Sequence, residues 1–133
     1  MRRLVLATVA VAAALVPAAP AGADAQAQAA AGPRLSVQPP TVRLGDPVVI
    51  RGRRWPVFEN CSRRVRLTLE SVQNAAPIGV VRVRRDGRFL RRWTPTAAKI
   101  GPGEWTVVAR MRCESGKDGS PFTLRRAAGL RIR

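Results

Sequence analysis

The clearest alternation of apolar and polar residues in this chain runs from Trp105 to Cys113, and a second one runs from Arg63 to Glu70. A period of two is typical of strands with one buried face. Each run lies beside one of the two cysteines, because Cys113 ends the first run and Cys61 shortly precedes the second. We therefore expect these two strands to form the centre of the domain.

The cysteines suggest how the central strands pair. If the strands are antiparallel with Cys61 opposite Cys113, Val65 faces Ala109 and Arg64 faces Arg110, so apolar pairs share one face of the sheet. Two cysteines in an exported chain predict one disulfide, here between neighbouring strands. Closing a loop of about fifty residues would stabilise the fold by roughly 4 kcal/mol. Two free thiols or a bridge between molecules are the alternatives.

Shorter apolar runs fill the chain from Leu35 onward, and glycine, proline, asparagine and aspartate separate them. Asp86-Gly87 lies between two such runs and predicts a type I′ hairpin turn. Further strands are expected at 35–37, 41–44, 48–50, 78–84, 88–94 and 122–133, with a turn at 74–77, a connection at 96–103 that could hold one helical turn over 97–100, and a loop at 114–121. Seven or eight short strands predict an all-β antiparallel sandwich over residues 34–133.

The chain begins with the features of an export signal. Met1-Arg2-Arg3 is basic, residues 4–16 are mostly apolar, and Ala21-Gly22-Ala23 has the small-residue pattern of a cleavage site. Residues 1–23 are therefore predicted to be a signal peptide, with an uncleaved anchor as the alternative, although the apolar run is short for a membrane span. Residues 24–33, rich in alanine and glutamine, are predicted to be a flexible spacer. We expect a secreted protein, with association with the cell wall as a further expectation.

Three stretches resemble those of exported bacterial immunoglobulin-like modules: Gly45–Pro56 (GDPVVIRGRRWP), Asp86–Phe89 (DGRF) and Gly101–Val107 (GPGEWTV). The resemblance spans roughly residues 35–113 and implies an immunoglobulin-like sandwich. Such modules serve as spacers, adhesins and units that bind substrates or cell walls. One departure is Met111, which stands where an immunoglobulin domain has a tyrosine.

The chain is also similar in size, secretion and fold to the enediyne-antibiotic apoproteins. Those proteins carry two disulfides and a chromophore cleft, whereas this chain has cysteines for one disulfide. A small-molecule carrier is therefore an alternative function, and it would require an apolar cleft between strands.

The composition argues against catalysis. The chain has no histidine, so Ser-His-Asp and Cys-His arrangements cannot be built, and with both cysteines paired no ordinary zinc site can be assembled. The 8 acidic residues are scattered, and nothing pairs two carboxylates across a cleft as a glycosidase requires. We expect a protein that is not an enzyme and that has no metal or cofactor.

Arginine provides the candidate binding surface. Lysine and arginine together number 24 against 8 acidic residues, and a net charge of +16 favours anionic partners. Alternation places six arginines on the outer face of three strands that we expect to be neighbours: Arg64, Arg66, Arg82, Arg84, Arg110 and Arg112. Guanidinium groups bind phosphate and carboxylate through two hydrogen bonds. This face could bind an anionic cell-wall polymer or another polyanion; a merely solvated face, in a domain with no ligand, is the alternative.

The end of the sandwich that carries the disulfide offers a second candidate. Trp55 could stack a sugar or a base, and a tryptophan that caps the core is the alternative. The Trp55–Cys61 and Glu114–Pro121 loops are expected to lie together at this end, where rigid strands would present them.

Overall fold

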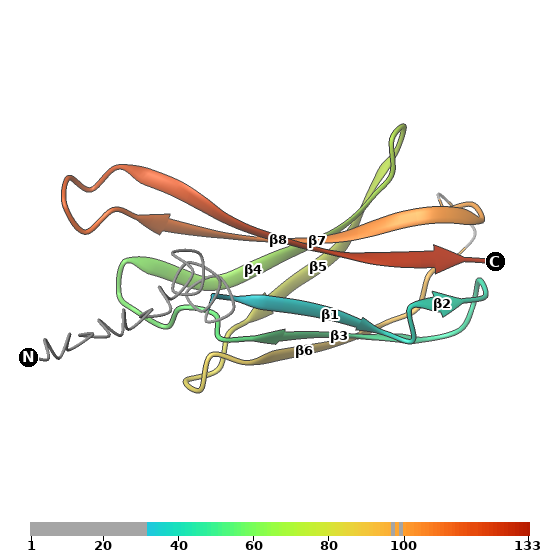
Figure 1. Ribbon diagram of the computed structural model, residues 1–133, viewed down its shortest axis with the longest axis horizontal. Helices are drawn as coiled ribbons and strands as arrows, with labels where there is room; N and C mark the ends of the chain where they lie inside the picture. The colour runs from blue at the N-terminus through green and yellow to red at the C-terminus, as the bar shows by residue number, and fades with distance from the viewer. Residues whose placement is uncertain (1–31, 97, 99) are drawn as a thin grey trace, which may run out of the picture. The chain divides into compact units, whose positions relative to one another are not determined.

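Eight strands form where the alternation of side chains predicts them, and they lie in two layers (Figure 1). The computed structural model describes residues 32–133 except 97 and 99. The predicted signal peptide, most of the spacer and two positions of the predicted helical turn lie outside the described residues. The strands are β1 (Arg34–Gln38), β2 (Thr41–Val42), β3 (Val48–Arg53), β4 (Cys61–Glu70), β5 (Ala75–Arg82), β6 (Phe89–Trp93), β7 (Gly103–Glu114) and β8 (Pro121–Ile132).

The strand order is that of an immunoglobulin-like sandwich. One sheet has three strands in the order β1-β3-β6, and the other has five in the order β2-β8-β7-β4-β5. Strands β1, β3 and β6 take the places of immunoglobulin strands A, B and E, and β4, β7 and β8 those of C, F and G. Pro39 and Pro40 separate β1 from β2, which pair in different sheets. Within the described residues, no helix is long and apolar enough to cross a lipid bilayer.

Strands β4 and β7 pair antiparallel inside the five-stranded sheet, with Cys61 opposite Cys113, as predicted. Beyond the cysteines the predicted register is wrong by two residues, because Val65 faces Met111 and not Ala109. A bulge between Cys61 and Val65 places two extra residues in β4, and Arg63 within it has a φ of 58°. A shift of two residues keeps the alternation of side chains, so the inner and outer faces are those predicted.

The inner side chains of the two sheets form one hydrophobic core. The Trp105 side chain is 7% exposed and donates its indole N–H to the carbonyl oxygen of Gly101 at 2.8 Å. Burying an aliphatic side chain contributes about 1.5–3 kcal/mol, so the central strands contribute most of the stabilising area. The side chains with 0% exposure are Val48, Ile50, Val65, Leu67, Leu69, Val83, Val107, Ala109 and Met111.

The Asp86-Gly87 turn lies where the sequence predicts it, but the predicted turn type is wrong. The carbonyl oxygen of Arg84 accepts the N–H of Gly87 at 3.0 Å, and only Gly87 in this turn has a positive φ, at 78°. This geometry is a type I turn closed by a glycine bulge. The flanking strands then pair in different sheets, β5 with β4 and β6 with β3. The turn therefore carries the chain from one layer to the other.

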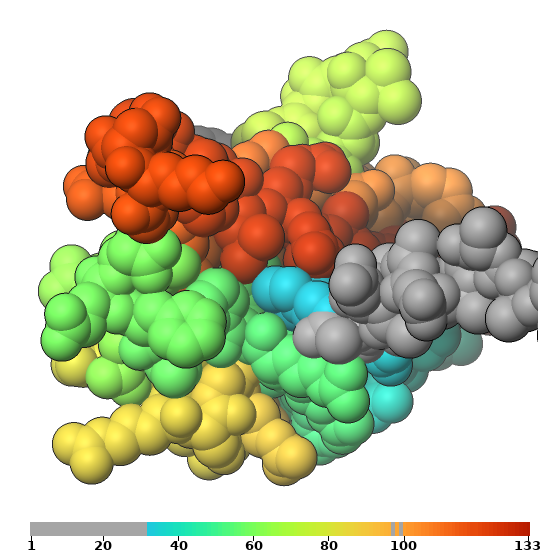
Figure 2. Space-filling model, turned by 60° about the vertical axis from the view of Figure 1, so that its left-hand side comes forward, coloured from blue at the N-terminus to red at the C-terminus, as the bar shows by residue number. Residues whose placement is uncertain are grey.

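The turn predicted at 74–77 also lies elsewhere. The N–H of Ser71 donates to the carbonyl oxygen of Asn74 at 2.8 Å, and β5 already begins at Ala75. The resulting β4–β5 hairpin projects from the body of the sandwich (Figures 1 and 2). Val72 at its tip is fully exposed.

Replacing Gly52 tests the packing between β3 and β6. The Phe89 ring lies over Gly52, its partner across the strands, and a Cβ atom on Gly52 would overlap that ring. We expect Gly52→Ala to lower the free energy of unfolding by about 1–3 kcal/mol, measured by urea denaturation. Gly129→Ala is the matched control, because a Cβ atom on this β8 residue meets no heavy atom within 4 Å. Equal losses in the two variants would contradict the proposed overlap.

Removing the disulfide tests its contribution to stability. Cys61 and Cys113 are bonded and lie 52 residues apart in sequence. In the chain-entropy model, a disulfide that closes a loop of this length lowers the entropy of the unfolded chain and thereby stabilises the folded protein by roughly 4 kcal/mol. We expect the Cys61→Ser/Cys113→Ser variant to lose about this much unfolding free energy. Reduction of the wild-type protein should give a comparable loss, and a loss below about 1 kcal/mol would show that the loop constraint matters little.

Candidate anion-binding site

The outer face of the five-stranded sheet carries arginine on four neighbouring strands. Arg66 on β4 lies between Val80 on β5 and Arg110 on β7. Arg110 lies in turn opposite Arg125 on β8. Arg64 lies opposite Arg82, and not opposite Arg110 as the predicted register placed it. The expectation that β4, β5 and β7 are neighbours is correct, with β4 between the other two.

An open pocket of about 470 Å³ lies on this face, and we call it the arginine trough. Its lining residues are Ser62, Arg64, Arg66, Val80, Arg110, Arg112 and Thr123. Four of the six predicted arginines therefore meet in one place. Arg82 lines a neighbouring pocket together with Arg63 and Arg64. Arg84 is not part of the trough: it lies at the β5–β6 turn, where its Nε is 3.8 Å from a carboxylate oxygen of Asp86.

One arginine of the trough is ion-paired. Arg110 donates from both terminal nitrogens to Glu70, at 2.9 and 3.2 Å, and also donates to the hydroxyl of Thr68 at 3.0 Å. The Thr68 hydroxyl donates in turn to Glu70 at 2.9 Å. The hydrogen bond from Arg110 is the main cause that holds the pKa of Glu70 below its ordinary value of 4.5, and burial opposes it. Arg110 is thus fixed in place and largely neutralised.

An apolar residue lies near the ion pair. Val108 lies opposite Thr68 and alternates with Arg110, so its side chain belongs to the outer face. It is nevertheless only 1% exposed, so neighbouring side chains shield it from solvent. Val108 lines a shallow pocket together with Glu70 and Arg125, so the carboxylate of the ion pair lies beside an apolar patch of the sheet.

Three arginines of the trough have no such partner. Within the described part of the chain, no carboxylate lies within 4.0 Å of the guanidinium groups of Arg64, Arg66 or Arg112. These side chains are exposed and extend from paired strands. The trough therefore presents three cationic hydrogen-bond donors that form no ion pair with a carboxylate of the described residues.

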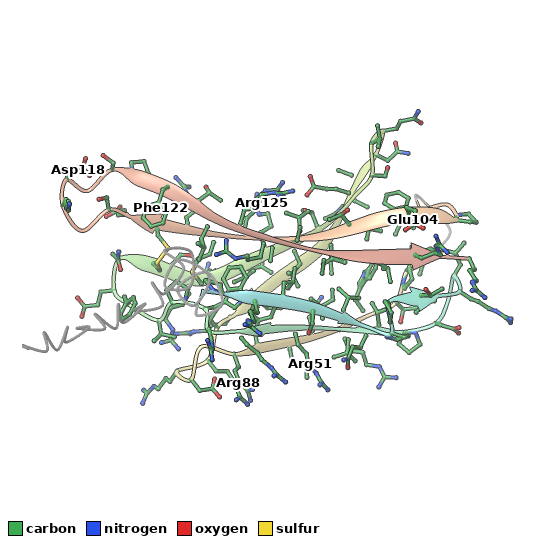
Figure 3. All side chains as sticks on the ribbon, viewed as in Figure 1. Arg51, Arg88, Glu104, Asp118, Phe122 and Arg125 are labelled. Carbon is green, nitrogen blue, oxygen red and sulfur yellow. A yellow bond between two sulfur atoms is a disulfide. The ribbon has the colours of Figure 1, made fainter. Side chains whose placement is uncertain are left out.

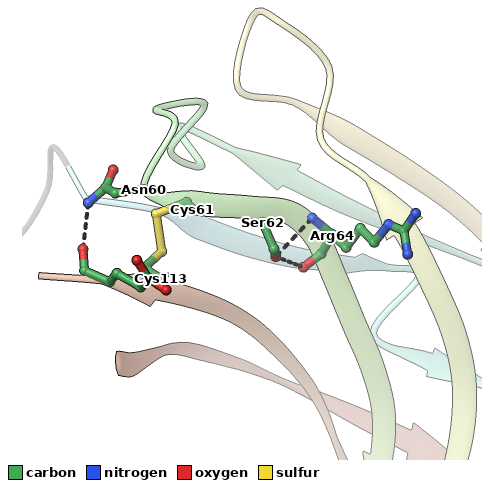
Figure 4. Close-up of a disulfide and its surroundings, with 6 residues drawn as sticks. Asn60, Cys61, Ser62, Arg64 and Cys113 are labelled. Atoms are coloured by element: carbon green, nitrogen blue, oxygen red, sulfur yellow. Dashed lines mark hydrogen bonds between the residues drawn. A yellow bond between two sulfur atoms is a disulfide. The ribbon is translucent and has the colours of Figure 1, made fainter. Parts of the chain in front are cut away.

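The two predicted loops do lie together (Figure 2), at the end where Cys61 is bonded to Cys113 beside Asn60 (Figure 4). The side chain of Asn60 donates to the carbonyl oxygen of Glu114 at 2.7 Å, and the N–H of Glu114 donates to the carbonyl oxygen of Asn60 at 2.7 Å. Within the β7–β8 loop, the N–H of Ser120 donates to Asp118 at 3.0 Å, which lowers the pKa of that carboxyl. Phe58 and Phe122 are exposed apolar residues of these segments, at 69% and 47%.

Trp55 does not offer a stacking surface. The side chain is 2% exposed, packs against Phe89 at a centroid distance of 5.6 Å, and donates its indole N–H to the carbonyl oxygen of Arg34 at 3.0 Å. The hypothesis that it stacks a ligand is therefore wrong, and Trp55 is a core residue. The chain continues from Trp55 into an exposed loop, which is why the sequence alone left both interpretations open.

Sequence reasoning missed two members of the site. Arg125 lies on a strand whose alternation is weak, and only its pairing with Arg110 shows that it faces outward. The sequence shows Glu70 at the end of a predicted strand but does not show that it forms an ion pair. The two-residue shift at the bulge brings it opposite Thr106, which leaves Arg110 within reach along the neighbouring strand.

Comparison with known proteins adds little. No protein-family model and no curated protein matches the sequence. Among solved structures, murine CRIg is similar, with 14% sequence identity and a TM-score of 0.41, over 76% of this chain and 98% of that one. The sandwich is assigned from its own strand order, since the likeness is distant. The comparisons support neither a bacterial origin nor the likeness to enediyne apoproteins.

Replacing Glu70 tests the ion pair. Because the pKa of Glu70 is lowered in the folded protein, the pair stabilises the fold above pH 4.5 and loses this effect as the pH falls through the lowered value. We expect Glu70→Gln to reduce the unfolding free energy by about 1 kcal/mol at pH 7, a discounted value for a partly exposed pair. The difference should vanish in acid.

The control is Glu104→Gln, which removes the ion pair with Arg131. Its two side chains are 60% and 68% exposed, against 35% and 30% for Arg110 and Glu70. Urea denaturation across the pH range should give a smaller change for this variant. If the effect of Glu70→Gln were the same at acidic and neutral pH, the ion pair would not be its cause.

Proposed function

We propose that this protein is an exported, non-catalytic immunoglobulin-like module that binds anionic polymers at or near the cell surface through the arginine trough. The observation that carries the proposal is the convergence of Arg64, Arg66 and Arg112 on one open pocket, without a carboxylate partner in the described residues. The ligand class follows from the chemistry of guanidinium groups, which bind phosphate, sulfate and carboxylate oxygens through paired N–H donors.

The architecture favours such binding. Like charges that face each other across strands destabilise a sheet, and both Arg64–Arg82 and Arg66–Arg110 are cross-strand neighbours. An anion between them relieves this repulsion, so binding and folding stabilise each other. The strands hold the Cα positions in place, and only the side chains lose freedom on binding. The Arg110–Glu70 pair keeps one side of the trough ordered before a ligand arrives.

Export and location at the surface are supported by the amino-acid sequence. The N-terminal pattern of charge, apolar run and small residues is that of a signal peptide. The disulfide between Cys61 and Cys113 suits an oxidising compartment. A net charge of +16 would concentrate the protein at an anionic wall or membrane surface.

No observation favours the small-molecule carrier in the same way. A carrier needs an enclosed apolar cleft, whereas each pocket described above has charged side chains in its lining. A structural domain without any ligand is the remaining alternative, and it predicts no binding beyond general charge attraction.

Charge reversal in the trough tests the proposed function. We expect Arg64→Glu/Arg66→Glu to weaken binding to an anionic oligomer, such as a short heparin fragment, by about tenfold or more, and to make the dependence of log affinity on log salt shallower by roughly two neutralised charges. Binding is measured by fluorescence anisotropy over a salt series.

The matched control is Arg43→Glu/Arg133→Glu, which changes the net charge equally. Both residues are exposed, and the backbone links their segments at the other end of the sandwich through the hydrogen bond from Leu44 to Arg133. This variant should lose affinity only slightly. Equal losses in the two variants would mean that total charge, and not the trough, determines binding.

A further inference from the structure

The outer face of the three-stranded sheet is also covered by arginine. Burial alternates along β3 and β6, so that Ile50 and Phe89 point into the core while Arg51 and Arg92 point outward. The exposed residues Arg51, Arg53, Arg88 and Arg92 make up what we call the second arginine face. Gly52 and Phe89 are cross-strand partners on the inner face of the sheet. Their neighbours in sequence, Arg53 and Arg88, therefore lie on the outer face.

Within the described residues, the strands of this face carry no acidic side chain, and the carboxylate beside it belongs to Asp86, which accepts the backbone N–H of Arg88 at 3.1 Å and lies 3.8 Å from Nε of Arg84. Strands β1, β3 and β6 have neither aspartate nor glutamate in their sequences, RLSVQ, VVIRGR and FLRRW. Within the described residues, the carboxylates that form ion pairs belong to Glu70, Asp86 and Glu104, and none of them pairs with the second arginine face. In the described residues, its four guanidinium groups therefore have no carboxylate within 4.0 Å, as is also true of Arg64, Arg66 and Arg112 in the trough.

The two cationic surfaces point in opposite directions. Figure 3 shows Arg51 and Arg88 projecting from one side of the sandwich and Arg125, on the trough's sheet, from the other. The two sheets and the core between them separate these surfaces. Stacked sheets lie about 10 Å apart, and the side chains add to this distance. One small anion therefore cannot contact both faces.

We propose that the second arginine face is an independent binding site for the same anionic polymer, so that one molecule of this protein can link two polymer chains. The proposal rests on the proposed function of the trough and extends it from binding to cross-linking. Charge complementarity selects the occupant, because a surface with four arginines and no carboxylate has its best partner in a chain of repeated anions. Leu90, which is 57% exposed between these arginines, adds an apolar contact for the polymer backbone.

Cross-linking is tested by light scattering with long-chain polyphosphate as the probe and the secreted, processed protein. The wild-type protein should scatter strongly at intermediate ratios of protein to polymer and less when protein is in large excess, because each chain is then coated separately. Tripolyphosphate should bind without scattering, since one short anion cannot reach two proteins. The control Arg43→Glu/Arg133→Glu should scatter as the wild type does.

Variants of each face separate the two sites. Arg51→Glu/Arg92→Glu should still bind immobilised polyphosphate through the trough but should no longer scatter. Arg64→Glu/Arg66→Glu should bind more weakly, through the second face alone, and should not scatter either. Thermal unfolding confirms that each variant is folded, and the corresponding Arg→Gln variants serve where charge reversal prevents folding.

The possible results distinguish the inference from the proposed function. If Arg51→Glu/Arg92→Glu scattered like the wild type, the second face would not be a site, and binding by the trough would be unaffected. If that variant lost all binding while Arg64→Glu/Arg66→Glu bound normally, the second face and not the trough would bind the polymer, and both the function proposed for the trough and the cross-linking would be overturned. A wild-type protein that binds polyphosphate in soluble complexes only would overturn cross-linking alone.

Discussion

Strand β4 pairs on both sides, with β5 and with β7, and three of its inner side chains are completely buried. Its register must satisfy two demands: Cys61 has to meet Cys113, and the apolar row has to face the core. Without the bulge, Arg63 would stand opposite Met111 on the inner face. The two extra residues remove this conflict, and the Arg63 guanidinium donates instead to the carbonyl oxygen of Val83 at 2.9 Å. The bulge leaves Arg64 and Arg66 on the outer face and changes their partners on β7.

A two-layer sandwich has two outer faces, and strand alternation fills both with whatever polar residues the sequence provides. Here those residues are mostly arginine, so each layer carries repulsion between neighbours. The core and the disulfide must offset this repulsion. Within the described residues, Glu70 is the carboxylate that pairs with an arginine of the trough, and it holds Arg110 in place. The same arrangement leaves the other trough arginines open to external anions.

Much of the fold could be predicted from the sequence because strand alternation and turn residues are local features. The eight strands, the central pair and the opposed cysteines all follow from them. The register of β4 could not be predicted, since the residue with positive φ in the bulge is Arg63 and not a glycine. The Asp86-Gly87 turn was found, but its conformation and its role between layers depend on how β5 and β6 pair with other strands.

The candidate site could also be predicted only in part. The outward direction of Arg64, Arg66, Arg110 and Arg112 depends only on alternation, which the bulge preserves. The burial of Trp55 could not be predicted, because a tryptophan next to an exposed loop can point into the core or toward solvent, and tertiary packing decides which. Arg125 and the second arginine face required the strand order, which decides which residues of distant segments share a face.

The placement of arginines on strands and not on loops bears on what such a surface can recognise. Residues that alternate along a strand are about 6.6 Å apart, and neighbouring strands are about 4.8 Å apart, so the Cα atoms that carry the arginine side chains form a repeating array. A closed pocket would select one small ligand by its shape. An open array of this kind matches the repeat of a flexible polymer, and its affinity grows with the number of anions engaged. The geometry therefore favours polymer binding with limited selectivity for the monomer, on either face of the sandwich.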